Sequence, residues 1–167
     1  MSGNATETIR IVSIAFNSRG VGFAVLDGSF LLDWGSIKAE SNSKMTFLER
    51  TMREIAWYEP TLVVFEDISG NLRRSKCSRE LEVKLCKRLE AVGITVSHTE
   101  TDEARRTLNR FGHDIVFKTD FIPVLVDYFP QLEVSAPQRR KTWDGEDYRM
   151  AIFVALALAL HNLDRLT

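Results

Sequence analysis

A short apolar run that ends in two acids constrains the fold most. Residues 61–67 read TLVVFED and lie between Pro60 and Gly70. An uninterrupted apolar run between turn-forming residues predicts a β-strand that is buried on both faces, in the middle of a sheet covered by helices. Because successive side chains of a strand point to opposite faces, Glu66 and Asp67 cannot face the same way. We expect one of them to mark a site at the carboxyl end of a central strand, and the alternative is that both acids are simply solvated.

The rest of the chain predicts a mixture of strands and helices. Residues 20–26 and 30–37 are joined by an Asp-Gly-Ser turn, which with 9–14 predicts three antiparallel strands. Serines at 41–43 offer caps for the first helix. The predicted elements are strands at 9–14, 20–26, 30–37, 61–67 and 94–98, and helices that end near 57, span 78–91, 101–111 and 119–129, and run from 144 to about 163.

The composition indicates one folded domain, residues 1–167, with a net charge close to zero. The net charge is -1 and 44% of the residues are hydrophobic, so any nucleic-acid surface must be a local basic patch. Residues 1–7 are polar, lack the apolar core of a signal peptide and are expected to be disordered. The longest apolar run, 151–160, is too short to cross a bilayer. We therefore expect a cytoplasmic protein with no membrane contact.

The cysteines and histidines give no site by their spacing. Cys77 and Cys86 are nine residues apart, which suits neither a zinc site nor a redox motif and indicates a reducing compartment. The three histidines, His98, His113 and His161, show no ligand spacing, and none is interpreted as catalytic.

Three short motifs follow one another along the chain. Residues 14–22 read IAFNSRGVG, with a Ser-Arg pair and a later Gly in the first hairpin, and Glu66 closes the fourth strand. Residues 144–151 read DGEDYRMA, an Asp-x-x-Asp that leads into an Ala-rich helix, and Lys118 opens the helix before it. In this order and spacing the motifs resemble those of the RuvC-type Holliday-junction resolvases, a branch of the ribonuclease H-like superfamily, over roughly residues 9–161.

The resemblance implies both a fold and an activity. The fold is the α/β ribonuclease H-like type, a five-stranded mixed sheet of three antiparallel N-terminal strands and two parallel additions, with helices on both faces. The activity is metal-dependent phosphodiester hydrolysis on structured DNA, or on RNA, with two Mg²⁺ or Mn²⁺ ions held by carboxylates. Glu66, Asp144 and Asp147 would be the metal ligands and Lys118 would steady the phosphate. These resolvases work as dimers, so a homodimer is an option, although no pattern identifies a dimer face.

The chain departs from the family pattern in the first strand. The family's aspartate, which bridges both ions, falls at Ala15, and the glycine of the turn is Asn17. Asn17 offers only a neutral oxygen, and Asp67 points away from Glu66. Metal binding is therefore expected to be weak. The protein is either a weakened nuclease or a non-catalytic module that binds nucleic acid or a protein partner, and a ribosomal-RNA-processing nuclease of the YqgF type is a further alternative.

The acids at 144–147 also have a purely structural interpretation. Asp144 suits a helix N-cap, and Glu146 and Asp147 would then lie in the first turn, where the helix dipole favours negative charge. The two interpretations are compatible, because a capped helix start is a rigid place to mount a ligand.

Basic residues near the acids are the expected nucleic-acid contacts. One cluster follows the central strand and another precedes residue 144, and clustered Arg and Lys supply sequence-independent affinity for phosphates. For each cluster the alternative is an ordinary solvated face, as for a third group at 105–110. The predicted nucleic-acid-binding residues are Arg73, Arg74, Lys76, Arg139, Arg140 and Lys141.

Overall fold

Five strands form one mixed sheet in a computed structural model that describes residues 7–70, 75–138 and 145–167. The strands are β1 (Arg10–Phe16), β2 (Gly20–Asp27), β3 (Phe30–Lys38), β4 (Leu62–Glu66) and β5 (Thr95–Thr99). Their spatial order is β3-β2-β1-β4-β5. The first three are antiparallel neighbours, β4 is parallel to β1, and β5 is parallel to β4. The predicted mixed sheet is therefore confirmed.

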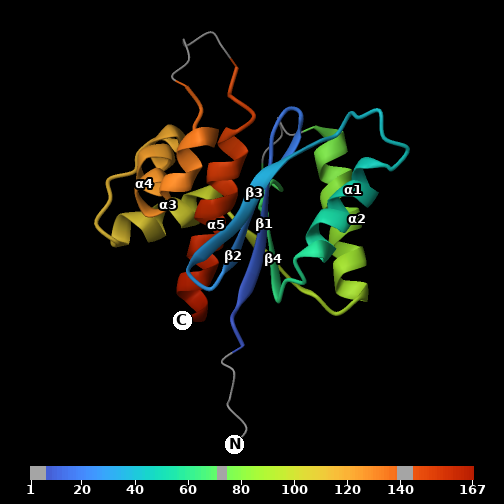
Figure 1. Cartoon of the computed structure of the whole chain (residues 1–167), viewed down its shortest axis with the longest axis horizontal. Helices are drawn as coiled ribbons and strands as arrows, with labels where there is room; N and C mark the ends of the chain where they lie inside the picture. Colours follow the sequence, from blue (N-terminus) through green and yellow to red (C-terminus); the bar gives the residue numbers. More distant parts are fainter. Residues whose placement is uncertain (1–6, 71–74, 139–144) are drawn as a thin grey trace, which may run out of the picture.

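Helices cover both faces of the sheet (Figure 1). One face carries α1 (Phe47–Trp57) and α2 (Lys76–Ala91), and the other carries α3 (Thr101–Arg110), α4 (Phe121–Tyr128) and α5 (Met150–Leu166). Two 3-10 helices, η1 (Lys118–Asp120) and η2 (Pro130–Ser135), lie on either side of α4 in the chain. Within the described residues, no helix has the length and apolar character needed to cross a membrane.

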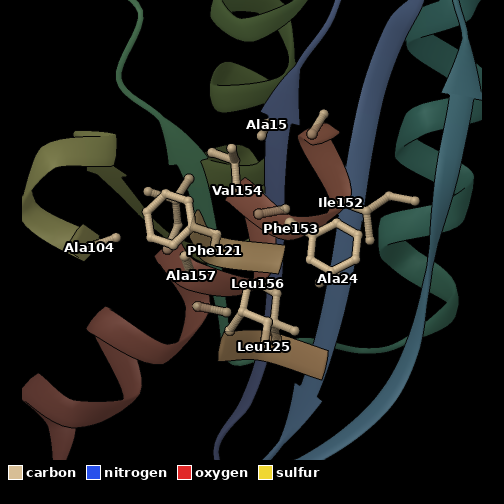
Figure 2. Packing of buried hydrophobic residues seen from close by; sticks show 14 of the residues in the cluster. Ala15, Ala24, Ala104, Phe121, Leu125, Ile152, Phe153, Val154, Leu156 and Ala157 are labelled. Atoms are coloured by element: carbon tan, nitrogen blue, oxygen red, sulfur yellow. The ribbon is translucent and has the colours of Figure 1, made fainter. Parts of the chain in front are cut away.

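The C-terminal helix is the centre of the larger core. Residues 150–159 of α5 are all buried, because the helix lies between the sheet and the helices α3 and α4. Figure 2 shows two small side chains of the sheet, Ala15 and Ala24, beneath it. Both are fully buried. At Gly22 a side chain is impossible without movement, since an added Cβ would lie 2.7 Å from the backbone of Ala151. Small residues thus let the start of α5 rest directly on β1 and β2.

Two helices begin later than the sequence predicts. The start of α1 is fixed by Thr46, whose hydroxyl accepts the amide of Glu49 while the Glu49 carboxylate accepts the amide of Thr46, so this capping box replaces the serines at 41–43. The start of α5 is Met150 and not residue 144. Before it, the Asp147 carboxylate accepts the backbone amide of Arg149 and forms a local turn. The interpretation of Asp147 as a residue of the first helical turn is therefore wrong.

We expect Gly22→Ala to lower the free energy of unfolding by about 1–3 kcal/mol, because the new methyl group would push the α5 backbone away from β2. Gly70→Ala is the matched control, since nothing lies within 4 Å of a Cβ added there. Urea unfolding of the two variants measures the difference. Equal stabilities would show that α5 does not rest on Gly22.

Candidate functional site

The carboxyl ends of β1 and β4 lie side by side, because these strands are parallel neighbours. Alternate residues of β1 and β4 pack against α5, and the residues between them pack against α1 and α2. This alternation puts Ala15 and Glu66 on the α5 face. Asp67 instead lines a hollow beside His98, on the α2 side. Of the two acids, Glu66 is therefore the one that looks toward the start of α5.

Glu66 is buried, with 5% of its surface exposed. Its Oε2 accepts the backbone amide of Phe16 at 2.9 Å. The carboxylate thus joins the last residue of β4 to the last residue of β1 and offsets part of the cost of burying its charge.

Asp147 is held by the side chain of Arg149. One carboxylate oxygen lies 3.1 Å from Arg149 Nε and the other lies 2.9 Å from Nη2, and the first also accepts the Arg149 backbone amide at 2.9 Å. Asp147 is buried, whereas 31% of the Arg149 side chain is exposed. The hydrogen bonds that the Arg149 guanidinium donates to this carboxylate raise the pKa of Arg149 above its ordinary value. A bidentate contact between a guanidinium and a carboxylate is among the strongest polar contacts in proteins.

Asn17 attaches the turn before α5 to the end of β1. Its amide nitrogen donates to the carbonyl of Tyr148 at 3.1 Å, and its carbonyl oxygen accepts the backbone amides of Arg19 and Gly20. The Arg19 guanidinium also lies over the Tyr148 ring, 4.6 Å from its centroid. Asn17 therefore organises the first hairpin and places Asp147 next to it, and its oxygen is occupied by this turn.

The other predicted residues are distributed as follows. Lys118 lies 3.0 Å from Glu146, so η1 is joined to the residue before Asp147. Lys76 lies at the start of α2 with 90% of its side chain exposed and pairs loosely with Glu80. Outside the described residues lie Arg73, Arg74, Arg139, Arg140, Lys141 and Asp144.

Two hollows meet at this edge of the sheet and form one groove. The smaller, of about 420 Å³, includes Asp147 and Glu146 in its wall, and the larger, of about 710 Å³, includes Arg19 and Lys38. Both are also lined by Asn17, Ser18, Ser75 and Ser78. Ser75 is the N-cap of α2, and its hydroxyl accepts the Ser78 amide at 3.1 Å. The positive end of a helix thus opens into the groove, a polarity that suits anions.

Known structures share this architecture, although no family model and no curated protein sequence matches the chain. A Thermus thermophilus RuvC structure superimposes with a TM-score of 0.64 at 14% identity, over 92% of this chain and 95% of that one. RuvC from the same organism in complex with Holliday junction substrate gives a TM-score of 0.65 at 10% identity, over 94% and 96%.

The chain has the RuvC fold. The predicted ribonuclease H-like α/β class, with its five-stranded sheet covered on both faces, is confirmed. At these identities the likeness establishes the architecture, and the chemistry has to be argued from the residues present.

Of the predicted metal ligands the structure describes Glu66 and Asp147, and these two alone do not fit a centre for two divalent ions. Ala15 supplies no oxygen, Glu66 is bound to a backbone amide, and Asp147 is bound to a guanidinium. In the described parts of the chain, three metal-ligating side chains meet only at Glu82, Cys86 and His98, on the other face of the sheet. The metal-ligand roles of Glu66, Asp144 and Asp147 stay predictions. Arg149 and Asn17 are the residues that sequence reasoning missed or misjudged.

An aspartate at position 15, where the resemblance predicts one, tests whether the acids converge. We expect Ala15→Asp to lower the free energy of unfolding by about 2–4 kcal/mol in the absence of metal, because it puts a second carboxylate beside Glu66 in a fully buried position. Millimolar Mn²⁺ should restore part of the loss.

Ala24→Asp is the control for this rescue. Ala24 is equally buried under α5, but it pairs with Ser13 and so lies further than Ala15 from the end of the sheet that carries Glu66. Thermal unfolding with and without Mn²⁺ compares the two variants. Rescue of neither, or of both to the same extent, would show that no metal pocket forms around residue 15.

Proposed function

We propose that this chain binds branched DNA in the groove at the carboxyl edge of its sheet and cleaves it weakly or not at all. One observation carries the proposal. In this RuvC fold, the buried Ala15 stands on β1 where the resemblance predicts a carboxylate. At the same edge of the sheet, Arg149 neutralises the charge of Asp147. The edge therefore balances its charge with a cationic side chain of its own.

The groove suits a nucleic-acid backbone by its shape and its charges. It runs past the N-terminus of α2 and past Arg19 and Lys38, which are contacts of the kind that hold phosphates without reading bases. Ser75 and Gly145 line the groove; in the chain, Ser75 lies within the first predicted basic cluster and Gly145 follows the second. Those clusters would therefore join the described chain at the groove.

Branched DNA is the favoured substrate class because of the fold. RuvC of T. thermophilus, which shares it over most of both chains, has been solved with a Holliday junction. Any residual hydrolysis would need Mg²⁺ or Mn²⁺, weakly held by Glu66, Asp144 and Asp147, as the resemblance predicts. The resemblance also allows a homodimer. The proposal includes a homodimer only for a junction to which two copies of the chain bind.

Binding is tested with a fluorescent four-way DNA junction at several salt concentrations, beside a duplex and a four-way RNA junction. We expect the DNA junction to bind most tightly. Arg73→Gln combined with Arg74→Gln should weaken binding and reduce the log–log salt slope by about one unit per lost phosphate contact. The matched control is Arg105→Gln with Arg106→Gln, two arginines of α3 that pair with Asp102. An unchanged slope in the first double variant would contradict the assignment.

Cleavage is tested with the same junction and Mn²⁺. The unaltered chain should cleave little or nothing, and Ala15→Asp should raise the rate by orders of magnitude, because a bridging carboxylate would align the reacting groups. Robust cleavage by the unaltered chain would overturn the proposed loss of catalysis. Absence of junction binding would overturn the proposal as a whole.

A further inference from the structure

Three metal-ligating side chains meet on the face of the sheet that carries α2, away from the proposed groove. Glu82 and Cys86 lie one turn apart on α2, and His98 projects from β5. Cys86 Sγ is 3.5 Å from Glu82 Oε1 and 3.6 Å from His98 Nε2. Glu82 Oε1 and His98 Nε2 also contact each other. The three side chains thus point their ligand atoms at one spot, all within 4.8 Å of one another.

We propose that Glu82, Cys86 and His98 bind one Zn²⁺ ion. In a tetrahedral zinc site with a Zn–S bond of about 2.3 Å and Zn–N and Zn–O bonds of about 2.0–2.2 Å, the sulfur lies about 3.6 Å from the other ligand atoms. The two sulfur separations here already have this value. The ion would take the place of the direct contact between Glu82 and His98.

The ligand set selects the kind of metal. A thiolate with an imidazole favours zinc and other thiophilic ions, whereas Mg²⁺ and Ca²⁺ prefer sites built of oxygen. Binding releases the thiol proton of Cys86 to solvent and forms one bond each from sulfur, nitrogen and oxygen to the ion. A carboxylate and a thiolate then carry two negative charges that balance the charge of Zn²⁺, which matters because the cluster is half buried.

A nucleophilic Cys–His–Glu triad is the competing use of the same residues, and the geometry disfavours it. In such a triad the carboxylate and the nucleophile bind different nitrogens of the imidazole. Here Glu82 and Cys86 both contact Nε2 of His98.

The surroundings hold the imidazole and leave a coordination position accessible. The His98 ring stacks on Phe65 of β4, with centroids 5.8 Å apart and the ring planes 25° from parallel. Glu82 and His98 also line a hollow of about 350 Å³ together with Asp67 and Arg79. Three protein ligands and an accessible fourth position are typical of a zinc site that keeps a water or takes an external ligand. This inference is independent of the proposed function.

The test uses the full chain, treated with chelator and then titrated with Zn²⁺ in competition with a chromophoric chelator, and separately with Co²⁺. We expect one Zn²⁺ per chain and a thiolate-to-cobalt charge-transfer absorption. Cys86→Ser should abolish that absorption and weaken Zn²⁺ binding by about 100-fold or more. Cys77→Ser, a change of the exposed second cysteine on the same helix, should leave both unchanged.

A second variant keeps the test independent of folding defects. His98→Gln alters a partly exposed side chain and should also weaken Zn²⁺ binding by about 100-fold while the circular dichroism stays unchanged. The proposal is overturned if the unaltered chain binds no Zn²⁺ at micromolar concentration, if the cobalt absorption survives Cys86→Ser, or if it disappears in Cys77→Ser.

Discussion

The close approach of α5 to β1 and β2 is the constraint on which the candidate site depends. Gly22 permits it, because the backbone of Ala151 occupies the space of a side chain there. The same approach places the turn before α5 at the end of β1, where Asn17 binds the carbonyl of Tyr148. Asp147 is therefore carried to the edge of the sheet by the backbone packing at Gly22 and by the contact between Asn17 and Tyr148.

Packing also explains how Ala15 is accommodated. A methyl group at the end of β1 belongs to the α5 core and is fully buried. At the position where the resemblance predicts an aspartate, the chain thus has an apolar contact in place of a possible ligand. Buried acids that face one another without a cation disfavour their charged forms. Here Glu66 accepts the amide of Phe16 and Asp147 is paired with Arg149, so each of these two acids has a polar partner.

Patterns of local periodicity carried most of the fold prediction. The apolar run before Glu66, the turn at 27–29 and the Ala-rich last helix each determine an element by burial or by turn chemistry. The start of α5 and the Asp147–Arg149 pair were not predictable in the same way, because a local turn competed with an equally plausible helix cap. Glu82 and Cys86 had helical spacing, but their partner His98 comes from a strand brought beside α2 only by the fold.

The end of the central strand links both proposed sites. Strand alternation turns Glu66 toward α5 and Asp67 toward the hollow beside His98, so one short segment serves both faces of the sheet. The helix that follows connects them again, since Ser75 lines the groove and Cys86, about 16 Å further along α2, belongs to the metal-ligating cluster. A helix behaves as a stiff rod over that length. An ion that fixes α2 against β5 would therefore also fix the helix end that faces the groove.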